Sequence, residues 1–420
     1  MNLKHRKTCR ICGNPNLTDV VDLGLIYSQG AFLKDGQENL YGRKIPNVVV
    51  RCDTSNYENA CGLVQTKHSV PTEILYSNYW YQSGISQTMK NHLAQIVSTS
   101  LGIVGEKESG LVIDIASNDN TLLRNYPSSF KKIGIDPSDI AKRQSDKDII
   151  VINETFPTKK ISPLLGEEKA DIVTSIACYY DVEDPKSFAE EIKKILNPKG
   201  VWVFEVAYLP SMIENLAYDS IVCEHVIHYH LAPLELMFKQ IGLRVFKAAE
   251  TPTNGGSIMC FVTHDDNFSY DDDDSKAQLL KLRLKEFLTG LDEGEIYKKF
   301  GAEIAGHKNK LVSFLTEKKA QGKTVHIYGA STKLNTILGY CGIGPDLIQY
   351  AAERSPEKHG CFTLDGIKII SEEKSREMKP DYYLVGPYHF KKEILEREKE
   401  TIAKGTRFIF PLPKLEVFPE

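Results

Sequence analysis

The chain has 420 residues, with 52 Lys and Arg against 56 Asp and Glu, and a formal net charge of −4. Hydrophobic residues make up 41% and charged residues 26%, which is typical of a globular protein with about two to four domains. No run of about 18 apolar residues occurs, so we expect no membrane-spanning segment. The charge balance, without a basic stripe, argues against a nucleic-acid partner. The polar start Met1–Cys9 lacks the apolar core of a secretory signal, and we expect a cytoplasmic protein.

Composition divides the chain into three regions, which we predict to be domains of residues 1–70, 71–270 and 271–420. The first region is rich in Cys, Gly, Asn and Asp, with only short β-like runs. The second alternates strand-like and helix-like segments, and the third opens on an acidic run followed by long helical patterns.

Four of the nine cysteines lie in the first 61 residues. Cys9 and Cys12 form a C-x-x-C knuckle, whereas Cys52 and Cys61 are separated by eight residues. Four thiolates can enclose a tetrahedral zinc ion, and the metal would supply folding free energy that so small a region cannot obtain from apolar burial. We predict a structural Zn²⁺ site made of these four cysteines. Two histidines could substitute as ligands, His5 and His68, and the alternative is a small core of unmetallated cysteines.

The second region carries five apolar runs spaced by amphipathic stretches. The runs are Leu111–Ile115, Lys132–Ile135, Ile149–Ile152, Ile172–Ile176 and Val201–Val206. This alternation is typical of βαβ units in a parallel, doubly wound sheet. We therefore predict a Rossmann-like central domain.

A polar turn follows the first of these runs. Residues 111–123 read as a strand, a turn and the start of a helix, and Asp136 ends the next run about 20 residues after the turn. A phosphate loop would need glycines where this turn has Ala116, Asn118 and Asn120, so a dinucleotide cofactor is disfavoured.

An acidic turn without a phosphate cradle suits S-adenosylmethionine, which is cationic and carries no phosphate. Its amino acid moiety and sulfonium would meet Asp114 and Asp119, and Asp136 would accept hydrogen bonds from the ribose hydroxyls. The predicted cofactor-binding residues are Asp114, Ala116, Asn118, Asp119, Asp136 and Pro137.

The third region begins with Asp271–Asp274, which we interpret as a helix start because carboxylates complement the positive end of a helix. Two helical patterns follow, with apolar residues recurring at three and four positions: Leu279, Leu280, Leu284, Phe287, Leu288 and Leu291, then Ile304, Leu311, Phe314 and Leu315. Buried strands are predicted at Val325–Gly329, Ile348–Glu353 and Tyr382–Val385. After the first strand comes a turn with Ser331 and Lys333, whose free backbone N–H groups and positive charge favour a phosphate, although an ordinary turn is the alternative.

In order along the chain, these motifs resemble those of the sugar-nucleotide C-methyltransferases that make branched deoxysugars. The matching segments are C-x-x-C at Cys9–Cys12, C-G-L-V-Q at Cys61–Gln65, Y-x-Y-x-S-G at Tyr79–Gly84, the cofactor turn at Ala116–Leu123, the E-H pair Glu224-His225 followed by Tyr229, G-G-S at Gly255–Ser257, G-A-x-x-K at Gly329–Lys333, K-x-G at Lys358–Gly360 and P-D-Y-Y-L at Pro380–Leu384. The resemblance covers residues 9 to about 390 and implies three parts: a zinc-binding module, a methyltransferase domain and a C-terminal α/β domain that contributes to sugar-nucleotide binding.

The resemblance implies methyl transfer from S-adenosylmethionine to a ring carbon, C3 in the family, of a 4-keto-6-deoxyhexose on a nucleotide carrier, GDP or dTDP. Removal of the proton alpha to the ketone gives an enolate, and a histidine is the side chain best suited to accept that proton near neutral pH. We expect His225 to be the base, Glu224 to orient it, and Tyr79 or Tyr81 to stabilise the oxyanion. The expected substrate-binding residues are Asp181, Tyr229, Asn254, Gly256, Ser257, Ser331 and Lys333.

Several positions depart from the family pattern. Ala177 and Asp181 replace an Asn and a His, and Val222 and Cys223 replace a Tyr and a His, so these residues bear on the identity of the sugar. One alternative keeps the fold but methylates oxygen or nitrogen of a related sugar nucleotide. Another is a non-catalytic zinc- and nucleotide-binding module. We expect a monomer.

Overall fold

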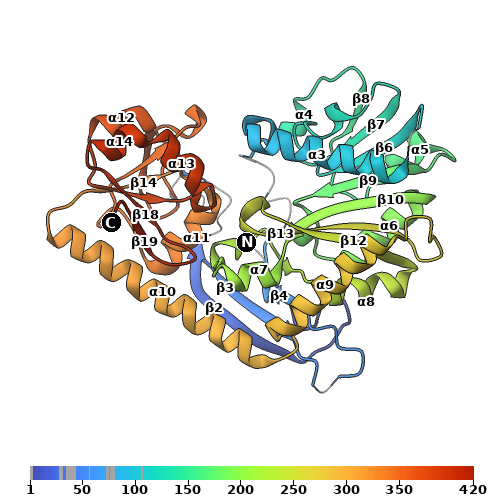
Figure 1. The fold of residues 1–420 in the computed structure, drawn as a ribbon, viewed down its shortest axis with the longest axis horizontal. Coiled ribbons are helices and arrows are strands. Elements are labelled where there is room, and N and C mark those ends of the chain that lie inside the picture. Colours follow the sequence, from blue (N-terminus) through green and yellow to red (C-terminus); the bar gives the residue numbers. More distant parts are fainter. Residues whose placement is uncertain are drawn as a thin grey trace.

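The computed structural model describes residues 3–27, 32–34, 44–55, 57–71, 75, 81–105 and 107–420. Two α/β lobes face each other, one built from the central part of the chain and one from its C-terminal part (Figure 1). The long strands of the N-terminal part run beneath both lobes (Figure 1). The predicted α/β fold, with a zinc-type cysteine module and two further sheets, is confirmed.

The central lobe is a seven-stranded sheet in the order β12-β13-β10-β9-β6-β7-β8. Its strands are β6 (Gly110–Ile115), β7 (Phe130–Ile135), β8 (Ile149–Ile152), β9 (Ala170–Ile176), β10 (Leu196–Ala207), β12 (Leu243–Thr251) and β13 (Ser257–His264). The first five are parallel, and β13 pairs antiparallel with both β10 and β12. Each predicted run of the second region is therefore a strand of one doubly wound sheet.

Helices cover both faces of this sheet because alternate strand residues point to opposite sides. Val112 and Val203 pack on one face with Leu93 of α3 (Gln87–Val104). Trp202 and Phe204 pack on the other face with side chains of α6 (Pro185–Ile195) and α8 (Leu231–Ile241). The central lobe also contains the short helices α4 (Asp139–Lys142) and α5 (Ile161–Leu165).

The N-terminal part forms a small antiparallel sheet in the order β11-β4-β3-β2. Its strands are β2 (Leu17–Tyr27), β3 (Lys44–Cys52), β4 (Val64–Thr66) and β11 (Ile227–His228), and a separate pair joins β1 (Lys4–His5) to β5 (His68–Ser69). Strand β11 comes from the histidine-rich segment after Glu224-His225, so this segment is attached directly to the cysteine module.

The C-terminal lobe has a six-stranded sheet in the order β16-β15-β14-β17-β18-β19. Its strands are β14 (Val325–Tyr328), β15 (Tyr350–Glu353), β16 (Lys368–Ser371), β17 (Tyr382–Val385), β18 (Arg407–Phe410) and β19 (Glu416–Phe418). The strands are parallel except β19. The helices of this lobe are α11 (Thr332–Cys341), α12 (Glu372–Glu377), α13 (Lys391–Arg397) and α14 (Lys399–Ala403).

Two long helices, α9 (Asp273–Thr289) and α10 (Gly294–Ala320), lead from the central lobe to the C-terminal one (Figure 1). The Asp272 side chain accepts a hydrogen bond from Ser275 N, which confirms the acidic run as a helix start. Leu279 and Leu282 are buried, whereas Leu284 and Phe287 remain exposed, so only part of the periodic apolar pattern faces a core.

One central segment packs with the C-terminal lobe. It comprises α7 (Leu209–Glu214) and the 3₁₀ turn η4 (Tyr218–Ser220), and Met212 and Tyr218 share a hydrophobic core with Ile337 and Tyr383. The other 3₁₀ turns are η1 (Ser83–Ile85), η2 (Leu123–Asn125), η3 (Tyr179–Asp181), η5 (Thr253–Gly255), η6 (Pro356–Lys358) and η7 (Tyr388–Phe390). Within the described residues, no helix has the length and apolarity needed to span a bilayer.

Candidate active site and metal centre

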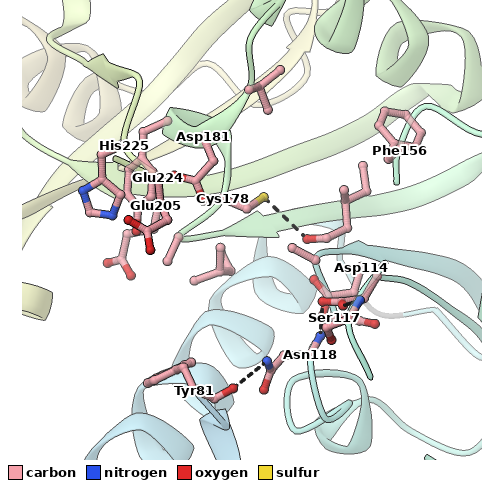
Figure 2. Close-up of a pocket in the computed structure, with 18 of the residues that line it drawn as sticks. Tyr81, Asp114, Ser117, Asn118, Phe156, Cys178, Asp181, Glu205, Glu224 and His225 are labelled. Atoms are coloured by element: carbon pink, nitrogen blue, oxygen red, sulfur yellow. Dashed lines mark hydrogen bonds between the residues drawn. The ribbon is translucent and has the colours of Figure 1, made fainter. Parts of the chain in front are cut away.

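A cavity of about 510 Å³ lies at the carboxyl ends of β6, β7, β9 and β10, where α11 of the C-terminal lobe contributes Thr332 and Lys333. In doubly wound sheets, ligands bind at this edge. The cavity has two ends, because Asp114, Ser117 and Asn118 gather on one side and Glu205, Glu224 and His225 on another (Figure 2).

The turn after β6 has the positive φ angles typical of glycine, although it contains no glycine. Ala116, Asn118 and Asn120 have φ values of 61°, 51° and 61°, in the left-handed region. Asn adopts this region readily, whereas Ala does so at a cost of about 1 kcal/mol. Gly134 on β7 is also required, because a Cβ there would lie 2.6 Å from Ser117 Oγ. The turn therefore keeps the left-handed backbone of a glycine-rich cofactor loop, although Ala116, Asn118 and Asn120 stand where glycines would.

Asp136 anchors this turn from the end of β7. Its Oδ2 accepts a hydrogen bond from Asn118 N (2.9 Å), and its Oδ1 accepts one from Ser138 N (2.7 Å). Each carboxylate oxygen retains a further acceptor position, available to a ribose hydroxyl. Asp119, in contrast, accepts from Gly84 N at 2.8 Å and does not line the cavity. Asp119 therefore fastens the turn to the segment before α3.

Asp114 is a buried carboxyl at the donor end. Burial, together with the nearby charge of Asp136, raises the pKa of Asp114 to about 7 even though Thr174 Oγ1 donates a hydrogen bond to it at 2.6 Å. A cation at this end of the cavity would favour the ionised form. The left-handed turn, the acceptor positions of Asp136 and the acidic Asp114 thus fit a cationic nucleoside such as S-adenosylmethionine.

His225 lies at the other end, in the loop before β11, with its ring against Tyr180 at a centroid distance of 4.0 Å. Its Nδ1 lies 2.9 Å from the carbonyl oxygen of Ser220. A carbonyl only accepts hydrogen bonds, so Nδ1 carries the proton and Nε2 keeps its lone pair. Burial, and then the charge of Lys333, lowers the pKa of His225 to about 3, so the ring is neutral at physiological pH.

Glu224 lines the same end of the cavity, but the group that fixes the His225 ring is the Ser220 carbonyl. The Glu224 carboxyl accepts a hydrogen bond from Cys223 Sγ at 3.1 Å, and burial raises its pKa. The hydrogen bond to the His225 ring is thus made by the Ser220 carbonyl, whereas the bond of the Glu224 carboxyl goes to Cys223, so the orienting role of Glu224 stays a prediction.

Sequence reasoning missed a further acidic group, which lies at the His225 end of the cavity. Glu205, 2% exposed on β10, accepts from His92 Nε2 of α3 at 2.7 Å, and Thr253 Oγ1 lies 3.1 Å from the same nitrogen. A carboxylate inside the apolar strand 201–207 was the available signal, since a buried charge needs a partner or a role.

The C-terminal lobe reaches the cavity through Lys333. Its Nζ donates to the Asn254 carbonyl oxygen at 2.6 Å, and both residues line the cavity. Burial lowers the pKa of Lys333, while Asp219 acts in the opposite direction. Ser331 instead caps α11, accepting from Leu334 N at 3.2 Å, and does not line the cavity.

The remaining predicted site residues separate into two groups. Those that line the cavity are Tyr81, Ala116, Pro137, Asp181, Asn254 and Ser257. Gly256 does not line it, but packs so closely on α7 that a Cβ would lie 2.6 Å from Ser211 Cβ. Tyr229 is fully buried in the core and stacks on Tyr179 at 5.3 Å, away from the cavity. Tyr79 lies outside the described residues.

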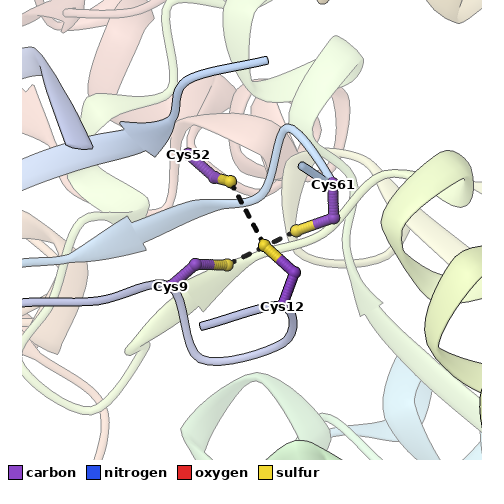
Figure 3. Close-up of side chains that lie close together, drawn as sticks. All are labelled: Cys9, Cys12, Cys52 and Cys61. Carbon is purple, nitrogen blue, oxygen red and sulfur yellow. Dashed lines mark hydrogen bonds between the residues drawn. The ribbon is translucent and has the colours of Figure 1, made fainter. Parts of the chain in front are cut away.

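The four predicted cysteines converge on one point (Figure 3). Their sulfur atoms all lie within 4.8 Å of one another, with Cys9–Cys61 at 3.4 Å and Cys12–Cys52 at 3.5 Å. A tetrahedral zinc ion with Zn–S bonds of about 2.3 Å requires sulfurs about 3.8 Å apart, so the cluster fits Zn²⁺ without an open position. The histidines considered as substitutes, His5 and His68, stack on each other instead, outside the cluster.

Three family models match consecutive parts of the chain. They are "Putative zinc binding domain" over residues 9–76, "Methyltransferase domain" over residues 87–248 and "C-methyltransferase C-terminal domain" over residues 252–413. Together with the cavity and the cysteine cluster, these matches decide the class of the protein. The chain is an S-adenosylmethionine-dependent C-methyltransferase. The predicted enzyme class, S-adenosylmethionine as cofactor and a four-cysteine zinc site are confirmed.

A curated relative of this C-methyltransferase is the C-methyltransferase NovU of Streptomyces niveus, 27% identical over 97% of this chain and 95% of NovU. Two solved structures are similar over part of the chain. One is an S-adenosylmethionine-dependent methyltransferase from Clostridium acetobutylicum ATCC 824, with 11% identity, a TM-score of 0.32 and coverage of 42% of this chain and 92% of that chain. The other is the CurJ carbon methyltransferase, with 9% identity, a TM-score of 0.33 and coverage of 43% and 56%.

Proposed function

We propose that this C-methyltransferase methylates a ring carbon, C3, of a nucleotide-linked 4-keto-6-deoxyhexose through an enolate, in the synthesis of a branched sugar. The motifs shared with sugar-nucleotide C-methyltransferases suggest the substrate class. The observation that carries the chemistry is the His225 hydrogen bond to the Ser220 carbonyl, which leaves Nε2 unprotonated in the same cavity as the donor turn.

His225 is the general base of this proposal. Its Nε2 accepts the proton from the carbon alpha to the ketone, and the C–H electron pair becomes the enolate. The imidazolium that forms is stabilised by its Nδ1–H bond to Ser220, and the carboxyl groups of Glu224 and Glu205 lie at the same end of the cavity. Tyr81 lines the cavity, and its hydroxyl would donate a hydrogen bond to the enolate oxygen.

The turn after β6, Asp114 and Asp136 would hold S-adenosylmethionine at the donor end of the cavity. Bound there, it would supply the methyl group to the nucleophilic carbon and leave as S-adenosylhomocysteine when its S–CH3 bond breaks. Because the donor turn and His225 line the same cavity, the two reacting groups would be held close together. No metal is needed for this step, and the zinc site lies among the cysteines of the N-terminal module.

The nucleotide carrier, GDP or dTDP, would bind at the junction of the lobes. Thr332 and Lys333 open α11 toward the cavity, and a helix N-terminus with an adjacent ammonium suits a pyrophosphate. Asp181 and Val222 line the cavity where the family has His and Tyr, so they are the residues expected to adapt it to a particular sugar.

Two observations weigh against the alternatives. Acceptor oxygen or nitrogen is disfavoured by the C-methyltransferase matches. A non-catalytic module with a decayed donor site is disfavoured by the turn, because Ala116, Asn118 and Asn120 keep the left-handed backbone of a working loop.

The test is a panel of GDP- and dTDP-linked 4-keto-6-deoxy sugars incubated with S-adenosylmethionine and the full-length enzyme in deuterated water. Mass spectrometry is expected to show a gain of one methyl group on one member, and NMR to place it on C3. Without the methyl donor, the same sugar is expected to exchange its alpha hydrogen for deuterium. Methylation on oxygen or nitrogen, or no methylation of any member, would overturn the proposal.

A further inference from the structure

The turn η4 (Tyr218–Ser220) comes from the central part of the chain but is held by the C-terminal lobe. Tyr218, Asp219 and Ser220 are at most 4% exposed. Tyr218 lies in the hydrophobic core of the C-terminal lobe, and α11 packs along the turn. The catalytic loop with Glu224 and His225 follows directly.

Polar contacts fasten the turn to that lobe. Tyr388 of η7 donates its hydroxyl to Asp219 Oδ1 at 3.1 Å. Tyr218 OH lies 3.0 Å from Nδ1 of His307 on α10, whose Nε2 lies 2.7 Å from the Pro411 carbonyl oxygen. Because that carbonyl only accepts, His307 Nε2 carries the proton and Nδ1 accepts from the Tyr218 hydroxyl.

The same turn orients His225. The Ser220 carbonyl that accepts from His225 Nδ1 belongs to the residue after Asp219, so a shift of Asp219 moves the acceptor of the base. Burial raises the pKa of Asp219, and Lys333 and the Tyr388 hydroxyl act in the opposite direction. Loss of the Tyr388 hydroxyl would leave a buried carboxyl short of a partner and free to move.

We infer that Asp219 and Tyr388 are positioning residues, through which the C-terminal lobe holds the Ser220 carbonyl and so sets the tautomer and direction of the His225 ring. The inference rests on the proposed role of His225 as the base. Tyr388 does not line the cavity, so its hydroxyl would act on the reacting carbon only through Asp219, Ser220 and the imidazole. Displacement of a catalytic group by about 1 Å can lower a rate about 100-fold.

The first test is the state of the ring. The full-length protein with ¹⁵N-labelled histidine is titrated with S-adenosylhomocysteine, and the ring nitrogens of His225 are assigned with His225→Gln. We expect a fixed Nδ1–H tautomer in the wild type and in Asp219→Asn, which keeps an oxygen for the Tyr388 hydroxyl. Tyr388→Phe and Asp219→Ala are expected to show averaged nitrogen shifts. A fixed Nδ1–H tautomer in both of these variants would overturn the inference.

The second test is catalytic, with the sugar nucleotide that the panel identifies. Tyr388→Phe is expected to lower kcat and the rate of alpha-hydrogen exchange by about 10- to 100-fold. The KM for S-adenosylmethionine and the affinity for S-adenosylhomocysteine are expected to stay within twofold (about 0.4 kcal/mol). The matched control is Tyr383→Phe, which removes another buried tyrosine hydroxyl of the C-terminal lobe, one that is bonded to Ser375 Oγ at 2.8 Å.

The outcomes separate the two proposals. If His225→Gln keeps full activity, the proposed base is wrong. If His225→Gln is inactive while Tyr388→Phe matches Tyr383→Phe in kcat, the base stands and the positioning role is wrong. Equal losses of kcat and of donor affinity in Tyr388→Phe would indicate a general structural defect and would also overturn the positioning role.

Discussion

Arg10, inside the Cys9–Cys12 knuckle, is buried against Glu183 of the central lobe, with Nη2 and Oε2 3.1 Å apart. Its Nη1 also donates to the Thr66 carbonyl at 2.8 Å, and Arg6 pairs with the same Glu183 at 2.6 Å. Glu183 lines the cavity two residues after Asp181. The metal module is therefore joined to one wall of the cavity, so we expect loss of the zinc ion to affect catalysis indirectly.

Removal of the metal is expected to loosen that wall. Cys12→Ser should lower the zinc content from about one ion per chain and reduce the Tm, because the cluster supplies folding free energy to a module with little apolar core. The measurements are metal analysis by mass spectrometry and calorimetry. Cys361→Ala, at a buried cysteine outside the cluster, is the control and should keep its zinc. Full zinc content in Cys12→Ser would contradict the prediction.

The Arg10–Glu183 pair should show measurable coupling. Burial opposes ionisation of Glu183, but the charges of Arg10 and Arg6 outweigh it and lower its pKa. A double-mutant cycle with Arg10→Met and Glu183→Gln, read by urea unfolding, should give a coupling of about 0.5–3 kcal/mol. The exposed pair Lys298–Glu295 is the control, with an expected coupling below about 0.5 kcal/mol. Equal coupling in the two pairs would show that burial of Arg10 adds nothing.

The central sheet was predictable because each strand of a doubly wound sheet is an apolar run with its own local signal. The runs around Ile113, Ile133 and Val173 correspond to β6, β7 and β9. The cysteine cluster was predictable for a similar reason, since thiols are rare and their spacing is visible. The cofactor turn could be located although its residues are not glycines, because Asn tolerates the left-handed backbone that the loop requires.

Contacts between distant segments were not predictable from one sequence. No local pattern shows that His92 reaches Glu205 or that β11 pairs with β4. Tyr229 follows the E-H pair in the sequence, but it lies in the core, directly after β11 and stacked on Tyr179. These contacts depend on how distant segments pack against one another, which is seen only in the folded structure.

Asp114 should make donor binding dependent on pH. Its pKa of about 7 in the folded protein exceeds the value of about 3.9 in an unfolded chain, so between about pH 4 and 7 the folded state binds more protons. The free energy of unfolding of the unliganded enzyme should therefore fall as pH rises through that range, relative to Asp114→Asn.

A cationic donor favours the ionised carboxylate, so affinity for S-adenosylmethionine should increase as pH rises through about 7 and level off above it. This affinity is measured by calorimetric titration from pH 5.5 to 8.5, roughly the range that brackets the pKa of Asp114. Asp114→Asn is the control and should bind with little pH dependence. A wild-type affinity that is flat over this range would show that Asp114 does not meet the donor cation.

The sugar end of the cavity should respond to Asp181 and Val222. Asp181→His and Val222→Tyr together restore the family residues, replacing an anionic and an apolar side chain by two hydrogen-bonding rings. The ratio of kcat/KM between two members of the sugar-nucleotide panel should change by about tenfold or more, which is about 1.4 kcal/mol. Affinity for S-adenosylhomocysteine should stay the same, since the donor turn is untouched. An unchanged ratio would place sugar discrimination elsewhere.

His225 should act as a base over a wide pH range. Its pKa of about 3 in the folded protein leaves Nε2 free at every pH above about 5, so kcat should not fall through the usual histidine range near 6.5. The unfolded chain binds the extra proton below about pH 6.5, so wild-type stability should decrease as pH falls toward 3, by up to about 1.4 kcal/mol per pH unit from this residue.

His225→Gln separates these two effects. The amide keeps a donor for the Ser220 carbonyl but cannot accept the sugar proton, so alpha-hydrogen exchange should stop while S-adenosylhomocysteine still binds. In His225→Gln the free energy of unfolding should also depend less steeply on pH in the acid range. The control is His228→Gln, at a buried neighbour whose pKa is lowered to about 4 by burial. This control should show a similar change in the pH dependence of stability but keep its exchange activity. A kcat that declines with an apparent pKa near 6.5 in the wild type would mean that substrate or donor binding raises the pKa of the base, and the plateau prediction would be wrong.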